Sequence, residues 1–284
     1  MTDIAPLLAR LEQFLERAER LLPGPRRTLE PTAHAWRWQK GEGPLPITRP
    51  ARIALDELLH LARQREILER NTLQFVRGLP ANNALLWGAR GTGKSSLVKA
   101  LFARYANDGL RVIEADREAL VELPHIADAV EGRPERFIVF ADDLSFEADD
   151  PSYKALKALL DGSLAAAPEN LLIYATSNRR HLMPEFMREN LETRLVDGEI
   201  HQGDAVEEKI SLSERFGLWV SFHPFTQDQY LDVVRHHLHA LGVAAWDEAR
   251  ALEAVRYAQG RGSRSGRVAA QFARDLAGRL RLTT

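Results

Sequence analysis

The chain has 284 residues, of which 45% are hydrophobic and 27% are charged, and its formal net charge is −2. This composition is typical of a folded globular protein of about two domains, and the near-neutral charge does not support binding to nucleic acid through bulk charge. No cysteine is present, which excludes disulfides, thiolate metal sites and cysteine nucleophiles. No apolar run approaches the ~18 residues of a membrane helix and no signal-peptide pattern is present, so we expect a cytoplasmic protein without a membrane partner.

Residues 1–50 are predicted to form an N-terminal helix and a linker. Apolar side chains recur at helical spacing over residues 4–22, and the Pro-Gly-Pro at 23–25 stops the repeat. The repeat is short for a coiled coil, so we interpret it as an amphipathic helix that packs on its own protein. Trp36 and Trp38 alternate in an extended segment of the linker, and we expect them to anchor it to a core. The alternative is that they stack on single-stranded nucleic acid.

Residues 51–225 are predicted to form an α/β domain. A helix over residues 56–77 comes first, and short apolar runs then alternate with helical stretches. This alternation is typical of a parallel sheet with helices on both faces. The predicted strands are Ala84–Trp87, Arg111–Ala115, Phe137–Ala141, Leu171–Thr176 and Leu218–Phe222.

Residues 226–284 are predicted to form a second, helical domain, because strand patterns cease after Pro224. Helices are expected over residues 226–239, 246–259 and 265–280.

The most specific motif is a phosphate-binding loop of the Walker A type. Residues 88–95, GARGTGKS, fit the pattern G-x-x-x-x-G-K-S/T and stand between a predicted strand and a predicted helix. Backbone N–H groups and the helix N-terminus favour phosphate there, Lys94 reaches the β- and γ-phosphates, and Ser95 offers its hydroxyl to Mg²⁺. We therefore predict ATP and Mg²⁺ as ligands, and ATP is favoured over GTP because no N-K-x-D motif follows. The predicted nucleotide-binding residues of this loop are Gly88, Ala89, Arg90, Gly91, Thr92, Gly93, Lys94, Ser95 and Ser96.

Carboxylates at the end of a predicted strand complete the expected site. The apolar strand over residues 137–141 runs directly into Asp142 and Asp143. Asp142 fits the Mg²⁺ ligand that a phosphate loop requires, in the manner of a Walker B motif. Asp143 and Glu147 are alternative candidates for the base that activates water. Carboxylates at this place also form helix caps and solvated turns, which is the structural alternative.

Together these motifs resemble those of AAA+ ATPases. From about residue 55 to the C-terminus, the chain looks like a member of an uncharacterised bacterial family of AAA+-type ATPases, a domain-of-unknown-function family. That family is similar in outline to replication initiators and helicase loaders. The resemblance implies a five-stranded parallel sheet with a C-terminal helical lid, and a nucleotide-dependent homo-oligomer. Asp143 departs from the pattern, because many such ATPases carry the longer Glu there.

The same resemblance implies roles for further residues. Asn178, after the fourth predicted strand, matches the sensor that orients the attacking water. Arg215, before the last predicted strand, matches an arginine finger offered to the next subunit. Arg267, or alternatively Arg264, matches a second sensor on the lid. A turn cap, an ion pair and a solvated helix start are the respective structural alternatives.

We therefore expect an AAA+-type ATPase that hydrolyses ATP with Mg²⁺ to drive a conformational switch on an unknown protein client. One alternative is a P-loop kinase of a small molecule, which needs neither a finger nor a lid arginine. Another is a nucleotide-gated scaffold with negligible hydrolysis, which the shorter Asp143 favours. A nucleic-acid partner stays open, although the net charge does not support it.

Overall fold

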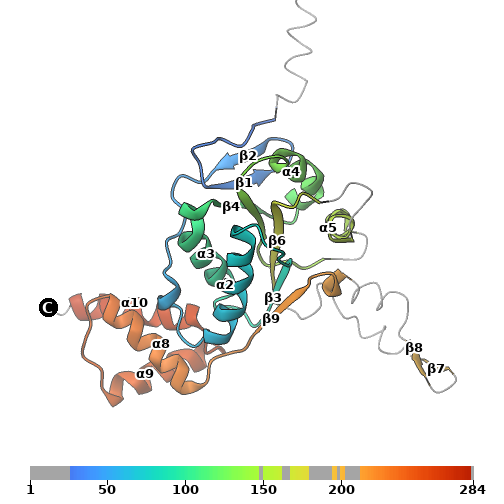
Figure 1. Cartoon of the computed structure of the whole chain (residues 1–284). Helices are drawn as coiled ribbons and strands as arrows, with labels where there is room; N and C mark the ends of the chain where they lie inside the picture. The colour runs from blue at the N-terminus through green and yellow to red at the C-terminus, as the bar shows by residue number, and fades with distance from the viewer. Residues whose placement is uncertain are drawn as a thin grey trace, which may run out of the picture.

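The computed structural model describes residues 26–146, 150–161, 167–178 and 212–282, together with the backbone of residues 194–196 and 199–201. The predicted helix over residues 4–22 lies outside the described residues. A central sheet carries helices on both faces, and three further helices form a separate group beside it (Figure 1).

The central sheet has seven strands in the order β2-β1-β4-β5-β6-β3-β9. Every neighbouring pair is parallel except β1 and β2, which are antiparallel. The predicted number of five strands is therefore wrong, because two strands from the predicted linker extend the sheet beyond β4. The strands are β1 (Ala35–Gln39), β2 (Gly43–Pro46), β3 (Ala84–Gly88), β4 (Leu110–Ala115), β5 (Arg136–Ala141), β6 (Leu171–Ser177) and β9 (Leu218–Phe222).

The five strands predicted from apolar runs are all present, within one residue at each end. Their side chains are buried on both sides because helices cover both faces of a parallel sheet. A short antiparallel pair, β7 (Arg194–Val196) and β8 (Glu199–His201), is separate from this sheet.

Two tryptophans attach the added hairpin to the core. Trp36 and Trp38 of β1 are 0% and 3% exposed, so the predicted anchoring is confirmed and the stacking of these rings on nucleic acid is wrong. Trp38 Nε1 donates to Glu122 at 2.8 Å, and Arg26 and the Gly41 amide also donate to this carboxylate. Burial alone would raise the pKa of Glu122, but these donors hold it below its ordinary value.

Two hydrophobic clusters fill the two faces of the sheet. One face packs against α4 and α5, and the other packs against α2 and α3. Short 3-10 turns, η1 (Leu55–Glu57), η2 (Ala106–Asp108) and η3 (Ala119–Glu122), connect these elements. The helices are α2 (Ala62–Val76), α3 (Lys94–Tyr105), α4 (Leu123–Val130) and α5 (Pro151–Asp161).

The helix predicted over residues 56–77 begins later than expected, at Ala62. His60 has a left-handed backbone with φ 59°, which interrupts a right-handed helix. The interruption lets neighbouring side chains enter different cores. Leu59 packs on the cluster of the C-terminal helices, whereas Leu61 is buried in the cluster beneath α2 and α3.

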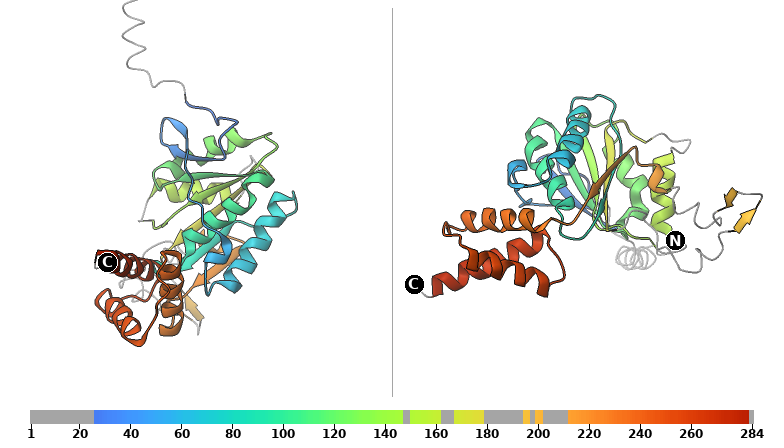
Figure 2. Two further views of the ribbon diagram at one scale, coloured as in Figure 1. Left: turned by 90° about the vertical axis from the view of Figure 1, so that its left-hand side faces the viewer. Right: turned by 90° about the horizontal axis from the view of Figure 1, so that it is seen from below.

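The C-terminal helices form a third hydrophobic cluster of their own. They match the predicted helices within two residues at each end. A capping box of Thr226 and Gln229 starts the first of them. Figure 2 shows this group beside the sheet and distinct from it. The helices are α8 (Gln227–Ala240), α9 (Glu248–Gly260) and α10 (Gly266–Leu282).

The division of the chain at residues 50 and 225 stays a prediction. β1 and β2 precede the first of these boundaries, yet they belong to the central sheet.

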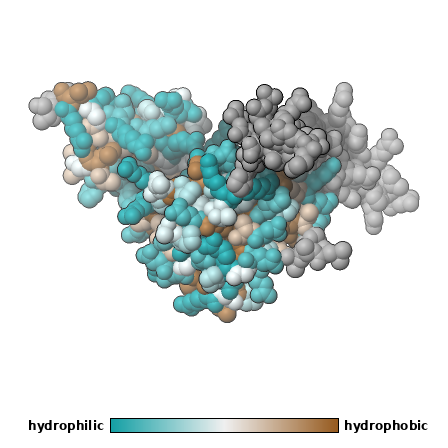
Figure 3. Space-filling view, turned by 90° about the horizontal axis from the view of Figure 1, so that it is seen from above, coloured by the Kyte–Doolittle hydropathy of each residue, from teal (hydrophilic) through white to brown (hydrophobic). Residues whose placement is uncertain are grey.

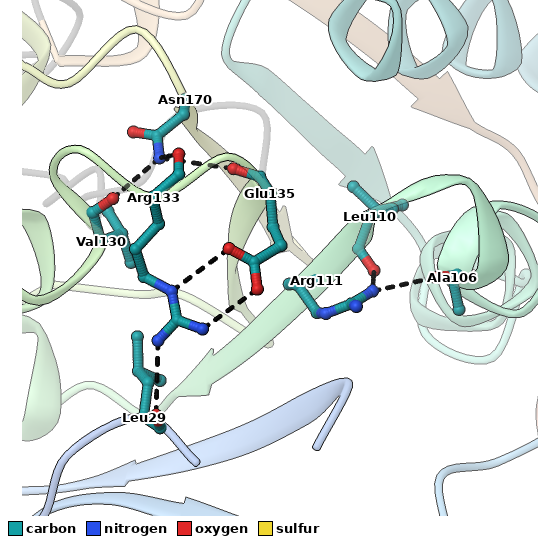
Figure 4. A network of polar contacts seen from close by, with 8 residues as sticks. All are labelled: Leu29, Ala106, Leu110, Arg111, Val130, Arg133, Glu135 and Asn170. Carbon is teal, nitrogen blue, oxygen red and sulfur yellow. Dashed lines mark hydrogen bonds and ion pairs between the residues drawn. The ribbon is translucent and has the colours of Figure 1, made fainter. Parts of the chain in front are cut away.

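A polar network fixes the edge of the sheet where β5 begins (Figure 4). Arg133 and Glu135 form an ion pair at 3.0 Å, and the hydrogen bond from Arg133 holds the pKa of Glu135 below its ordinary value. The side-chain Nδ2 of Asn170 donates to the backbone carbonyl groups of Val130, Arg133 and Glu135. This network lies at the opposite end of the strands from the phosphate loop.

The surface carries single exposed hydrophobic residues on different elements. Figure 3 shows a largely hydrophilic face with small, separate hydrophobic areas. Within the described residues, no helix combines the length and apolar composition that crossing a bilayer requires. The large exposed hydrophobic residues of the described part are Leu45, Leu79, Leu252 and Leu282.

Candidate nucleotide-binding site

The phosphate loop lies between β3 and α3, as the sequence predicts. Gly88 ends β3 with φ 136°, and a Cβ there would collide with the carbonyl oxygen of Phe222 in β9. Gly91 has φ 74°, and a Cβ there would meet Ser265 Oγ at 2.8 Å. Gly88 is therefore required by a close approach of backbone and Gly91 by close side-chain contacts, and both have a positive φ that favours glycine.

Lys94 is the first residue of α3, and its ammonium group folds back into the loop. It is 6% exposed, and its Nζ donates to the carbonyl oxygens of Gly88 and Ala89, each at 2.8 Å. It also donates to Asn178 Oδ1 at 3.2 Å. Burial lowers the pKa of Lys94, while the carboxylates of Asp143 and Asp142 act in the opposite direction. The loop thus holds a buried ammonium where phosphate oxygens would compete for its hydrogen bonds.

Ser95 and Asp142 come together from different elements. Ser95 Oγ, in the first turn of α3, donates to Asp142 Oδ1 at the end of β5 at 2.6 Å. Hydroxyl and carboxylate oxygens are suitable Mg²⁺ ligands, so this pair fits the predicted cation. Within the described ranges, no group of three or more His, Cys, Asp or Glu gathers as a metal site. Mg²⁺ at a phosphate loop takes few protein ligands, because phosphates and water supply the rest.

Asp143 has a left-handed backbone with φ 55°, a conformation that Asp adopts more readily than most residues. This geometry gives a physical reason for the shorter acid at a position where the resemblance implies Glu. Asn178 Nδ2 donates to Asp143 Oδ1, and the guanidinium of Arg90 lies 3.9 Å from the carboxylate. Glu147 lies outside the described residues, so the choice between the two candidate bases stays a prediction.

The remaining loop residues have more local partners. Thr92 Oγ1 donates to the carbonyl oxygen of Ala89 at 2.8 Å, which uses this hydroxyl within the loop. Ser96 lies in the first turn of α3 and is partly buried.

The start of α10 lies against the phosphate loop. The Arg267 amide donates to the carbonyl oxygen of Gly91 at 3.4 Å, and the Arg267 charge is close enough to help lower the pKa of Lys94. The Arg264 carbonyl accepts from the Phe225 amide at 3.2 Å, just before α8. The Arg267 backbone therefore contacts the loop, and Arg264 directly precedes Ser265, whose side chain lies against Gly91. The choice of one as the nucleotide sensor stays a prediction.

Arg215 is the one predicted site residue of the described part that the fold does not bring to this loop. It precedes β9, whose first residue Leu218 pairs with Ala84 at the start of β3, whereas the loop follows the end of β3. Its Nε donates to Asp161 Oδ1 at the end of α5. The ion-pair alternative is thus present in the structure, and a finger role requires a neighbouring subunit.

Thr176 is a site residue that the sequence analysis missed. It lies in β6, and its hydroxyl donates to Asp142 Oδ1 at 2.6 Å. A β-branched residue in an apolar strand is ordinary, so the pattern carried no functional signal. The only available clue was a hydroxyl two residues before Asn178, at the end of a strand expected to border the site.

Comparison with solved structures identifies the fold. The structure is similar to the Thermotoga maritima RuvB Holliday junction branch migration motor, with 14% identity, a TM-score of 0.53, and coverage of 81% of this chain and 66% of that chain. Two single-residue variants of that motor give TM-scores of 0.55 and 0.56 at 15% and 14% identity, covering 81% and 82% of this chain and 66% and 68% of theirs. The chain thus spans just under two thirds of the first of these structures. At such identity the likeness shows the fold, which is of the AAA+ type.

The curated proteins contain no match to the sequence. A family model described as "Protein of unknown function (DUF815)" matches residues 31–280, which is most of the chain. The chain therefore belongs to the DUF815 family, and it has an AAA+-type fold.

Proposed function

We propose that this protein binds and hydrolyses ATP with Mg²⁺ and uses the reaction to move its C-terminal helices against the α/β unit. The observation that carries the proposal is the meeting of α3 with the ends of β5 and β6. There Lys94 lies within hydrogen-bonding distance of Asn178, and Ser95 lies within hydrogen-bonding distance of Asp142. This is the set of groups that phosphoryl transfer at a phosphate loop requires.

Each residue has a distinct task in this proposal. Lys94 exchanges its bonds to loop carbonyls for β- and γ-phosphate oxygens, and Ser95 and Asp142 hold Mg²⁺. When bound, the cation neutralises charge on the phosphates. Asp143 accepts a proton from the attacking water, and Asn178 orients that water. Asn178 is hydrogen-bonded to both Lys94 and Asp143, which supports a link between the phosphate-binding lysine and the proposed base.

The contact between α10 and Gly91 supports movement of the C-terminal helices as the output. A ligand that displaces the loop, or that attracts Arg264 or Arg267, acts directly on the start of α10. We further propose a nucleotide-dependent homo-oligomer in which Arg215 reaches the γ-phosphate of the next subunit.

Nucleotide binding is tested with Lys94→Ala and a fluorescent ATP analogue. Lys99 lies five residues further along α3 and is partly buried, so Lys99→Ala is the matched loss of one positive charge from the same helix. We expect Lys94→Ala to abolish tight binding, because the phosphates lose their main charged partner, and Lys99→Ala to bind like the wild type. Equal affinity of Lys94→Ala and the wild type would remove the basis for the assigned loop.

A nucleotide-gated scaffold with negligible hydrolysis is the second candidate. It is favoured by Asp143, whose carboxylate is already held by Asn178 and whose side chain is short. Phosphate release measured at rising protein concentration separates the two candidates. Turnover that increases per subunit as the protein assembles supports the ATPase, and absence of turnover in an assembled, ATP-bound protein supports the scaffold.

A further inference from the structure

Thr176 is a buried hydroxyl near the end of β6. It is 1% exposed, and it pairs with Leu86 of β3, two residues before the phosphate loop begins. Burying a hydroxyl costs free energy unless it is hydrogen-bonded, and Val would fill the same space in a strand. The hydrogen bonds that the Thr176 hydroxyl makes are therefore what offsets the cost of burying it.

The bonds of Thr176 fix the segment that follows β5. Its Oγ1 donates to Asp142 Oδ1 at 2.6 Å and accepts from the Asp143 amide at 2.8 Å. Its backbone carbonyl accepts from the Leu144 amide at 2.7 Å. One residue of β6 thus holds three successive residues at the end of the neighbouring strand.

The bond to Asp142 bears on the cation site. Asp142 Oδ1 accepts from both Ser95 Oγ and Thr176 Oγ1, each at 2.6 Å. Ser95 is itself a proposed cation ligand and is partly exposed, whereas Thr176 is 1% exposed and is not a proposed ligand. Thr176 is therefore the donor that keeps the carboxylate oriented when Ser95 turns its oxygen toward a cation.

The bond to the Asp143 amide bears on the candidate base. Asp143 has φ 55°, which is costly for a residue with a Cβ unless its surroundings hold it there. The Thr176 hydroxyl supplies the acceptor for that amide and so stabilises the turn. The turn presents the Asp143 carboxylate to Asn178.

We propose that Thr176 is a positioning residue that orients Asp142 for Mg²⁺ and holds the turn at Asp143. The proposal rests on the proposed function, since it concerns the cation that accompanies the nucleotide.

The test compares Thr176→Val, which removes the hydroxyl, with Thr176→Ser, which keeps it. Thr72→Val is the matched control, because Thr72 is 0% exposed and its hydroxyl bonds the Leu68 carbonyl at 2.8 Å and the Tyr174 hydroxyl at 2.9 Å, away from the loop. Fluorescent ADP binding is measured in EDTA and during a Mg²⁺ titration. One readout is the ADP affinity without Mg²⁺. The other is the Mg²⁺ concentration that produces half of the full Mg²⁺-dependent change in ADP binding, and neither readout depends on turnover.

We expect Thr176→Val to need about 10- to 100-fold more Mg²⁺ for half effect, with unchanged ADP affinity in EDTA. Thr176→Ser and Thr72→Val should respond to Mg²⁺ like the wild type. Should Val prevent folding at this position, Thr176→Ala removes the same hydroxyl and is measured instead.

Wild-type Mg²⁺ affinity in the variants that lack the hydroxyl would overturn the inference, and so would an equal loss in Thr72→Val. A wild-type protein that binds no ADP would overturn the proposed function and this inference together. That result is distinguishable, because it is obtained before any variant is compared.

Discussion

Gly91→Ala is predicted to separate the phosphate loop from the start of α10. A Cβ at position 91 would lie 2.8 Å from Ser265 Oγ, 3.1 Å from Ser265 Cβ and 3.1 Å from Arg267 Cβ. Ser265 Oγ cannot turn away freely, because it accepts from the Val268 amide in the first turn of α10. The loop and α10 must therefore move apart, and the bond between the Arg267 amide and the Gly91 carbonyl is lost.

The expected loss of stability has two parts. Gly91 has φ 74°, and placing Ala in a left-handed backbone costs about 1–2 kcal/mol. Forcing extra volume into a packed contact costs about 1–3 kcal/mol more. The free energy of unfolding should thus fall by about 2–5 kcal/mol. Gly132→Ala is the control, because Gly132 has φ 71° and nothing lies within 4 Å of its Cβ position, so only the backbone cost applies.

The assay is urea unfolding followed by circular dichroism for the wild type, Gly91→Ala and Gly132→Ala. Adding Ser265→Gly to Gly91→Ala removes the obstructing side chain and should recover part of the loss, since Gly at a helix cap costs only a few tenths of a kcal/mol. If Gly91→Ala is no more destabilising than Gly132→Ala, the contact between the loop and α10 does not exist in solution and the reasoning is refuted.

Asp143→Asn should slow hydrolysis by about 10²–10⁴-fold while ATP binding survives; a larger loss in Glu147→Gln, measured as phosphate release, would reverse the assignment of the base. Arg215→Ala should bind ATP but hydrolyse it poorly, by about 10³–10⁵-fold if it is a finger, and mixing it with Lys94→Ala should restore turnover that neither shows alone. No recovery in mixtures that co-assemble would leave Arg215 as an ion-pair residue. Folding lowers the pKa of Glu122, so the stability that this carboxylate contributes is present above its ordinary pKa and is lost as the pH falls through the folded-state pKa. Glu122→Gln should therefore reduce the dependence of the urea unfolding midpoint on acid pH. An unchanged pH profile in Glu122→Gln would contradict this prediction.

Much of the fold could be predicted because its signals are local. A buried parallel strand appears as a short apolar run, and the five runs between Ala84 and Phe222 became strands. The signal of the phosphate loop was equally local, since its glycines and Lys94 all lie within residues 88–95. The hairpin of β1 and β2 was missed as sheet because Pro and Gly surround it and Pro44 and Pro46 lie in the edge strand itself.

The sequence by itself determined the five strands between Ala84 and Phe222, the three C-terminal helices and most residue types of the candidate site, because periodicity and motif spacing are properties of neighbouring residues. Only the tertiary structure decided which distant groups meet. It placed Thr176 against Asp142, joined Asn178 to both Lys94 and Asp143, and kept Arg215 beside Asp161. Those contacts depend on strand order and register, since the carboxyl ends of β3, β5 and β6 lie at one edge of the sheet while the start of β9 lies at the other. No pattern along the chain encodes that order, because it follows from how the helices pack on the two faces of the sheet.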